Sequence, residues 1–514
     1  MKRIYLLLTI LALFYGTGCS SKIVKPKALD TSFLESNYNL NKLLKKAEDE
    51  QSIVNPDILW MDGIDSRTDL TFAAFRQEAG KKIFCLVLDC SPDKDSLILL
   101  PLGPDETPIS VLADSRKLRD LRQIAELYNP EKTLPDEIIR VSIKEAIHKK
   151  LLGSPLPEPK HIYAVAANFP SHLNYDLAID DIKSKKKILN KALARVFLKY
   201  PAVNPPPMQI FDENSLSGLL GPFDEITYPE TILIPKTLNG DLHLKTSAKL
   251  DYEVEIGVVF QKKLIWEMIK TAGDDEIRSA IAGFVLINDT KVRNPQVMLK
   301  VLCDECISQP DDPYRINDKK LDMTLGIWDQ YTCHWWSYAA SCGRFTSIGP
   351  FFVVAPDDRS FPSRAIMCAR SYGPQEQRKY PKPENCIEDV LYLRQFSKVT
   401  EQDSYPDSMI WNIPKIVRSI LSPDSVLSFT GTEPTIEAGD IICLGTPGGT
   451  VLTSMPFFIF DISEDILFWK EPLFWYDMFF KGKSKFFVHN GDKLFLWGQG
   501  LGFQYLTVRQ DHNK

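Results

Sequence analysis

The stretch KLDYEVEIGVVF, residues 249–260, places two glutamates, Glu253 and Glu255, inside a run of strand-forming residues. Successive side chains of a strand alternate between its two faces, so both carboxylates point the same way while Val254 and Ile256 point the other way. Two like charges at this spacing repel one another, and a cation that neutralises them makes a buried position tolerable. The alternative is a half-exposed strand with a solvated acidic face.

A second segment, AGFVLINDTKVRNPQ at residues 282–296, favours the interpretation that the two glutamates bind a cation. It is an apolar run that ends in Asn288 and Asp289, and the end of a strand is where polar side chains are typically delivered to a site. Carboxylate oxygens are hard ligands that select Mg²⁺, Mn²⁺ or Ca²⁺. The two segments together fit a divalent-metal site on Glu253, Glu255 and Asp289, and the solvated acidic face stays open as the alternative.

The composition is that of a large globular protein. The chain has 514 residues, of which 44% are hydrophobic and 25% charged, and its formal net charge is −6. Acidic and basic residues are interspersed, without the basic stripe that neutralises phosphates. Nucleic acid is therefore not expected as a partner.

The N-terminal sequence MKRIYLLLTILALFYGTGCSS has a basic start, a short apolar core and small residues before Cys19. This layout is typical of a secretion signal, and its GTGC ending resembles a bacterial lipobox, so residues 1–19 are expected to be a lipoprotein signal peptide with Cys19 as the lipidated residue. An ordinary cleaved signal and an uncleaved anchor are the alternatives. The expected location is the bacterial cell envelope, on the periplasmic or outer-membrane face, with the lipid holding the protein to the membrane.

In an oxidising compartment, cysteines that lie close together can pair. Six of the ten cysteines lie between residues 300 and 390, and we interpret them as disulfide staples of a surface elaboration: Cys303, Cys306, Cys333, Cys342, Cys368 and Cys386. The alternative is a zinc site on Cys303, Cys306, Cys333 and His334, for which a second CxxC is missing.

Composition and patterning divide the rest of the chain. Residues 20–68 are rich in Lys, Asn and Ser and suit a tether; residues 69–154 indicate a small β-rich module that includes a helix over residues 114–129. The proline-rich segment GSPLPEPK at residues 153–160 marks a boundary near residue 155, and residues 155–514 carry strand signals without strict alternation of strands and helices. The predicted class is mainly β with some α (α+β).

Six segments of the larger region resemble the fumarylacetoacetate hydrolase family, in order and in spacing. They are AVAANFPSH (164–172), SGLLGPFDEITYP (217–229), LDYEVEI (250–256), the NDTKVRNPQ segment (288–296), CGRFTSIGPFFV (342–353) and GDIICLGTPGG (439–449). The resemblance implies a mixed β-roll core whose mouth holds Mg²⁺, or Mn²⁺ or Ca²⁺, on Glu253, Glu255 and Asp289.

The same resemblance implies roles for further residues. His172 matches the family's catalytic histidine, a general base for water, although a histidine in a loop is more often a surface group. Arg344 stands where the family has a catalytic lysine. Arg293, Gln296 and Thr446 are implied to bind the substrate.

The sequence also departs from the family pattern. Tyr175 replaces a glutamate, with Asp176 one residue further on, and Asp212 and Glu213 replace a basic stretch. Arg344 keeps the charge of the lysine but cannot act as a base. Two insertions stand out, residues 297–342 and the aromatic-rich residues 452–487; the second could be a lid, an oligomer contact, a lipid-interface patch or ordinary core.

The resemblance thus predicts a metal-dependent hydrolase that cleaves a C–C bond in a small acylpyruvate-like or 1,3-dicarbonyl 2-oxo acid. Decarboxylase or isomerase activity on the same metal site and a non-catalytic, surface-anchored binding protein are the alternatives. The expected partners are the small anionic substrate, the membrane and a second copy of the chain in a homodimer.

Overall fold

The computed structural model describes about half of the chain, mostly its predicted β-rich regions. The described residues are 70–77, 81–91, 95–129, 137–166, 168–169, 172, 193–199, 219–235, 243–294, 336–341, 343–356, 365–372, 395–399, 409–425, 427, 433–447, 450, 487–498 and 500–511. Backbone alone is described for 233–235, 243–247, 365–372 and 395–399. The predicted signal peptide and tether, the aromatic insertion except Phe487, and the side chains of the six predicted disulfide cysteines lie outside this set.

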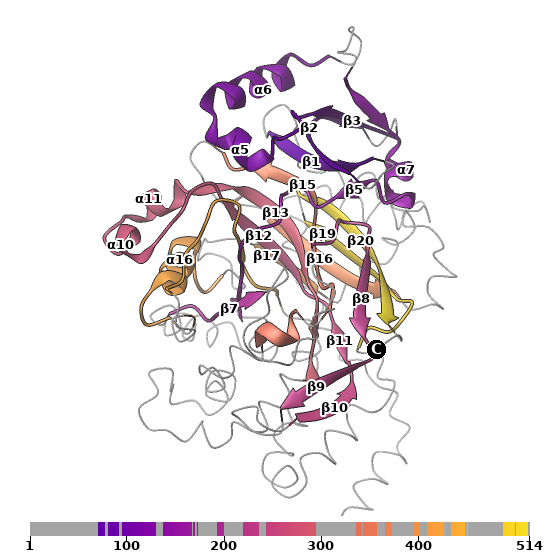
Figure 1. Ribbon diagram of the computed structural model, residues 1–514, viewed down its shortest axis with the longest axis vertical. Helices are drawn as coiled ribbons and strands as arrows, with labels where there is room; N and C mark the ends of the chain where they lie inside the picture. Colours follow the sequence, from indigo (N-terminus) through magenta and orange to yellow (C-terminus); the bar gives the residue numbers. More distant parts are fainter. Residues whose placement is uncertain are drawn as a thin grey trace, which may run out of the picture. The chain divides into compact units, whose positions relative to one another are not determined.

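An eleven-stranded sheet dominates the fold and carries the predicted metal ligands (Figure 1). Its strands pair in the order β4-β3-β2-β1-β15-β13-β12-β18-β6-β7, and β5 pairs separately with β1. The bounds are β1 Thr71–Arg76, β2 Lys82–Ser91, β3 Ser96–Pro101, β4 Ile139–Val141, β5 Leu152–Gly153, β6 Ile162–Val165, β7 Val196–Lys199, β12 Val254–Phe260, β13 Ile281–Asp289, β15 Thr346–Val354 and β18 Ile441–Cys443.

The strands of the predicted N-terminal module continue this sheet. β1 pairs antiparallel with β15, with Thr71 opposite Val353 and Phe72 opposite Phe352. The rings of Phe72 and Phe352 stack with their centroids 6.2 Å apart. Residues nearly 300 positions apart in sequence therefore share one ladder and one core.

A second sheet of five strands has the order β17-β16-β19-β20-β8. Its members are β8 Glu225–Pro229, β16 Ala365–Tyr372, β17 Gln395–Val399, β19 Lys493–Gly498 and β20 Gly502–Asp511. Two short ribbons complete the described strands: β9 Thr231–Pro235 with β10 His243–Ser247, and β11 Leu250–Asp251 with β14 Lys291–Val292. The prediction of a mainly β fold with some helix is confirmed.

The described helices are short, and most of them begin at a polar side chain that caps the first turn. They are α5 Pro108–Ala113, α6 Ser115–Leu127, α7 Ile143–His148, α10 Trp266–Ile269, α11 Asp274–Arg278 and α16 Ile413–Leu421. The Asp114 side chain accepts hydrogen bonds from the first-turn amides of α6, which confirms the helix expected over residues 114–129. The Asn412 side chain caps α16 in the same way. None of the helices within the described ranges is long and apolar enough to cross a membrane.

β12 and β13 form the centre of the core, since every residue of both strands is buried. Val254 pairs with Asn288 and Gly257 with Val285 in this antiparallel ladder. Gly283 has no room for a side chain, because a Cβ there would overlap the carbonyl oxygen of Val353 on β15. Burial on both faces explains why these strands read as apolar runs, and it makes the carboxylates at their ends unusual.

Candidate metal centre

The ladder between β12 and β13 positions the three predicted metal ligands. Glu253 immediately precedes β12, Glu255 is its second residue, and Asp289 is the last residue of β13. The backbone N–H of Asp289 donates to the carbonyl oxygen of Glu253 at 2.8 Å. Sheet register therefore fixes the third carboxylate beside the first two.

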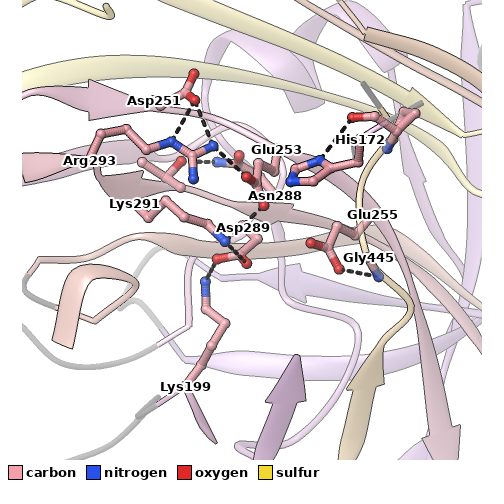
Figure 2. A network of polar contacts seen from close by, with 12 residues as sticks. His172, Lys199, Asp251, Glu253, Glu255, Asn288, Asp289, Lys291, Arg293 and Gly445 are labelled. Atoms are coloured by element: carbon pink, nitrogen blue, oxygen red, sulfur yellow. Dashed lines mark hydrogen bonds and ion pairs between the residues drawn. The ribbon is translucent and has the colours of Figure 1, made fainter. Parts of the chain in front are cut away.

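The three carboxylates form one buried cluster. Glu253, Glu255 and Asp289 are 3%, 1% and 0% exposed, and one oxygen of each lies within 4.8 Å of the others. Figure 2 shows the three side chains converging from the two strands. Hard oxygen donors in this arrangement fit a divalent cation such as Mg²⁺, Mn²⁺ or Ca²⁺.

Three cationic side chains already contact this cluster. Lys291 Nζ lies 2.8 Å from Glu253 Oε2 and 2.9 Å from Asp289 Oδ2, so it bridges the two carboxylates. Lys199 pairs with Asp289 Oδ1, and Arg293 pairs with Glu253 Oε1. The lysine ion pairs are buried at both ends, and a buried charge is stable only when it is paired in this way.

Lys199 reaches Asp289 from a distant strand. Three strands, β12, β18 and β6, separate β13 from β7 along the sheet, which would place the two ends roughly 19 Å apart if the sheet were flat. That distance exceeds the reach of a lysine side chain. The contact therefore requires the sheet to curl so that β7 faces the end of β13.

Lys291 is enclosed by aromatic rings as well as by carboxylates. Its Nζ lies 5.1 Å from the ring centroid of Phe197 on β7 and 5.9 Å from that of Trp336. The two rings pack against each other with centroids 5.8 Å apart. Aromatic faces attract a cation, and their bulk fixes its position.

Glu255 differs from the other two carboxylates because no described lysine or arginine pairs with it. Burial, followed by repulsion from Asp289 and Glu253, raises the pKa of Glu255 well above its ordinary value. Its Oε2 accepts a hydrogen bond from the backbone N–H of Gly445 at 2.8 Å. Glu255 is thus the carboxyl group that holds a proton most readily.

The pKa values of Glu253 and Asp289 are lowered, in contrast to that of Glu255. Burial alone would raise both pKa values, but the positive charges outweigh it: Lys291 and Arg293 lower the pKa of Glu253. Lys199 and Lys291 lower the pKa of Asp289. These two carboxyl groups are therefore ionised at neutral pH.

His172 lies beside the cluster (Figure 2). Its backbone N–H donates to the Phe169 carbonyl oxygen, and its Nδ1 lies 3.5 Å from the Pro447 carbonyl oxygen. A carbonyl can only accept, so Nδ1 carries the proton in this contact and Nε2 is the basic nitrogen. Burial lowers the pKa of His172 below its ordinary 6.5, which leaves the imidazole neutral at pH 7.

Of the predicted substrate-binding residues, Arg293 lies in the ion-pair network and Thr446 lies in a loop, next to Gly445 in sequence. Arg293 Nε and Nη2 hold Asp251 Oδ2 at 2.8 and 2.7 Å, so this guanidinium braces Asp251 and Glu253. Thr446 is buried in the loop after β18, between Gly445 and Pro447. Gln296 and Cys19 lie outside the described residues.

Arg344 lies beside an acid other than the three ligands. Its positive charge contributes to lowering the pKa of Asp224, and its Nε has no hydrogen-bond partner among the described residues. Its backbone bridges Thr227 of β8. Within the described ranges no ion pair joins Arg344 to Glu253, Glu255 or Asp289.

Asn288 supplies a further polar group at the same strand end. Its Nδ2 donates to Thr290 Oγ1 at 2.7 Å, whereas its buried Oδ1 has no hydrogen-bond partner in the part of the chain that the structure describes. A buried carbonyl oxygen without a hydrogen-bond partner costs about 1–3 kcal/mol. A ligand that pairs with Asn288 Oδ1 would remove this cost and would be bound more tightly as a result. The polar strand end drew attention to Asn288 in the sequence; nothing there singled out Lys199 or Lys291.

A buried carboxylate cluster at the ends of adjacent strands, with a histidine beside it, defines a candidate metal-dependent enzyme site. The family model "Fumarylacetoacetate (FAA) hydrolase C-terminal" matches residues 162–307 and 320–509. The chain belongs to the fumarylacetoacetate hydrolase family, which confirms the resemblance seen in the sequence. Members of this family are enzymes that commonly bind divalent metals.

Several solved structures are similar to the chain. A fumarylacetoacetate hydrolase from Exiguobacterium antarcticum is 15% identical with a TM-score of 0.42, covering 86% of this chain and 100% of its own. A probable 2-hydroxyhepta-2,4-diene-1,7-dioate isomerase from Mycobacterium abscessus is 19% identical with a TM-score of 0.40, covering 86% and 99%. A maleylpyruvate hydrolase from Sphingobium sp. SYK-6, in complex with manganese(II) and pyruvate, is 14% identical with a TM-score of 0.39, covering 86% and 100%. No curated relative matches the sequence.

Proposed function

We propose that this protein is a divalent-metal-dependent hydrolase that cleaves a carbon–carbon bond in a small acylpyruvate-like or 1,3-dicarbonyl 2-oxo acid. The observation that carries the proposal is the convergence of three buried carboxylates within 4.8 Å. Membership of the fumarylacetoacetate hydrolase family also supports the proposal. Mg²⁺ is the expected ion, with Mn²⁺ or Ca²⁺ as alternatives.

Glu253, Glu255 and Asp289 would hold the ion. A divalent cation there supplies Lewis-acid polarisation of two adjacent substrate oxygens. The protein's own part is to keep the ligands in place: Arg293 braces Glu253, and the Gly445 amide orients Glu255. Thr446, in the same loop as Gly445, would bind the substrate carboxylate, and Gln296 and Arg344 would orient the remainder.

His172 would activate the water. Its neutral imidazole can accept a proton at Nε2 while Nδ1–H stays with the Pro447 carbonyl. The water oxygen then adds to the carbonyl carbon distal to the substrate carboxylate. The C–C bond that links this carbon to the oxo-acid fragment breaks, its electron pair stays with the oxo-acid fragment, and the proton held at His172 Nε2 passes to that fragment's carbon, giving two acids.

A second function is a non-catalytic, surface-anchored binding protein that retains the fold. One observation favours it: Lys291 and Lys199 already pair with Glu253 and Asp289, so two of the three carboxylates are neutralised by the protein itself. A measurement of metal binding distinguishes the two functions. The hydrolase must bind a metal ion at the carboxylates, whereas a binding protein without a metal would keep the lysine ion pairs in place.

Calorimetric titration of the full chain in detergent with Mg²⁺ and Mn²⁺, in the presence of oxalate as a 2-oxo acid mimic, tests the proposal. Binding by the wild type and its loss in Glu253→Gln and Asp289→Asn is the expected result. Glu437→Gln is the matched control, because Glu437 pairs with Lys263 at 2.9 Å, outside the cluster. A wild type that binds neither ion with oxalate present, and hydrolyses no acylpyruvate, would overturn it.

We also propose that Cys19 is lipidated and anchors the protein in the bacterial envelope, and that the protein is a homodimer. The support is the signal-like sequence of residues 1–19. Cell fractionation tests the anchor: Cys19→Ala should move the protein from the membrane fraction to the soluble fraction. Light scattering of the purified protein would show twice the chain mass if it is a dimer.

A further inference from the structure

Lys291 is the feature of the site that a metal-binding role does not explain. Its ammonium group bridges one oxygen of Glu253 and one of Asp289, at 2.8 and 2.9 Å. These are two of the three groups whose oxygens would hold the ion. A lysine in this place competes with the ion for the same oxygens.

The surroundings keep the ammonium group where it is. Lys291 is 2% exposed, and the rings of Phe197 and Trp336 lie against it. Lys291 is also part of the short strand β14, whose pairing of Lys291 with Asp251 fixes its backbone. To withdraw from the site, the ammonium group would have to give up two buried ion pairs and the contacts with two rings, which is costly.

The charge count shows what a metal ion would change. With Glu255 ionised, as a metal ligand must be, the three carboxylates and the lysines Lys199 and Lys291 together carry one negative charge, and Arg293 is balanced by Asp251. A divalent cation converts this surplus into one positive charge. A buried net charge is costly unless a partner compensates it, and an anion beside the ion is the simplest partner.

We propose that Lys291 is an internal counter-ion that makes metal binding dependent on an anionic ligand. Metal alone binds weakly, because it must compete with the ammonium group and leaves an excess positive charge. Metal together with a small dianion, such as a 2-oxo acid substrate, binds tightly, because the anion compensates that charge. The inference rests on the metal site proposed above and adds that the metal and the anion enter as a pair.

The test is a titration of the full chain with Mn²⁺, with and without oxalate. For the wild type we expect oxalate to strengthen Mn²⁺ binding by about tenfold or more, a typical coupling between two ligand sites. Lys291→Met removes the charge while keeping most of the side-chain volume. This variant should bind Mn²⁺ alone about tenfold more tightly than the wild type, with a smaller effect of oxalate.

Two controls and one substitute variant make the result specific. Lys291→Arg keeps the positive charge and should retain the oxalate dependence. Lys82→Met removes a lysine that also lies over a ring, Phe84 at 4.7 Å, and should bind Mn²⁺ like the wild type. If Lys291→Met does not fold, as judged by circular dichroism, Lys199→Met carries the same test because Lys199 pairs with Asp289.

The outcomes separate this inference from the proposed function. If the wild type and Lys291→Met bind Mn²⁺ equally well without oxalate, Lys291 is no competitor and the inference is wrong, while the metal site stands. If Lys291→Met binds Mn²⁺ more weakly, the lysine supports the metal and the inference is again wrong. If neither protein binds Mn²⁺ with or without oxalate, the metal-dependent function itself fails.

Discussion

The backbone N–H of Asp289 donates to the carbonyl oxygen of Glu253, so the last residue of β13 is locked in register with the residue that precedes β12. A shift of one residue in this ladder would turn Asp289 to the opposite face and dismantle the carboxylate cluster. The geometry of the site is thus set by strand pairing in the most buried part of the fold.

His172→Asn should abolish most hydrolysis and leave metal binding intact. Loss of a general base typically lowers kcat by about 10²–10⁴-fold, and the His172 imidazole contacts the Pro447 carbonyl rather than a ligand carboxylate. Steady-state kinetics with an acylpyruvate and Mn²⁺ calorimetry on the same sample measure the two properties. His148→Asn, at the exposed end of α7, is the control. A fall in Mn²⁺ affinity would instead make His172 a metal ligand.

The rate should depend on pH through the same histidine. Only the neutral imidazole accepts a proton, and burial lowers the pKa of His172 below 6.5. The midpoint of the acid limb of kcat should therefore lie below pH 6.5. An acid limb above pH 6.5 would contradict this assignment.

Metal binding at pH 7 should release a proton from Glu255. The free protein holds that proton because burial, Asp289 and Glu253 raise the pKa of Glu255, whereas a ligand carboxylate must be ionised. Mn²⁺ affinity should accordingly rise with pH. Calorimetry in two buffers of different ionisation enthalpy, with oxalate present, measures the proton, and Glu255→Gln should bind more weakly and release none. Identical heats in both buffers for the wild type would rule the release out.

Gly445→Ala should destabilise both the fold and the metal site. Gly445 has φ +92°, which favours glycine, and a Cβ there would lie 3.0 Å from Asn168 Cβ and from the Val165 carbonyl oxygen. We expect a loss of about 1–3 kcal/mol in the free energy of unfolding, together with weaker Mn²⁺ binding, because the Gly445 amide orients Glu255. Urea denaturation measures the first effect.

Gly273→Ala is the matched control for this variant. Gly273 has φ −70° and no atom within 4 Å of a Cβ, so its substitution should change the free energy of unfolding by less than about 0.5 kcal/mol. Equal effects of the two substitutions would show that the conformation of Gly445 carries no special cost.

Asp224→Asn should destabilise the protein at pH 7 but not in acid. Burial alone would raise the pKa of Asp224, yet two hydrogen bonds of 2.5 Å from Arg76 outweigh it and hold the pKa below 3.8. A lowered pKa in the folded state gives stability that is present above pH 3.8 and lost as pH falls through the folded value. Urea denaturation should show a difference of about 1–3 kcal/mol at pH 7 that shrinks below pH 4. A difference independent of pH would contradict the ion-pair explanation.

Local patterning identified the three carboxylates that the structure brings together. Two-residue alternation puts Glu253 and Glu255 on one face, and Asp289 ends an apolar run, but these signals also fitted a solvated acidic face, and the family resemblance was needed to favour a metal. The helix over residues 114–129 follows from equally local signals, and α6 confirms it. The family assignment rested on several segments in order and is confirmed by the family model.

The counter-ions could not be predicted, because they depend on contacts between distant parts of the sheet. Lys199 meets Asp289 only because the sheet curls, and no local feature of the segment RVFLK indicates which carboxylate it reaches. Lys291 lies only two residues after Asp289, but β13 ends at Asp289 and β14 begins at Lys291, so strand alternation alone does not place the two side chains together. The charge of Arg344 contributes to lowering the pKa of Asp224, which lies about 120 positions earlier in the sequence.

The pairing of β1 with β15 determines how much of the chain is needed for solubility. A chain shortened to begin at residue 155 would retain every proposed metal ligand but would lose the strand that covers β15. The uncovered edge would present unpaired amide and carbonyl groups beside the apolar side chains of Phe351 and Phe352, a template for stacking copies edge to edge. We therefore expect the N-terminal strands to protect the protein against aggregation, and recombinant forms should begin before Thr71.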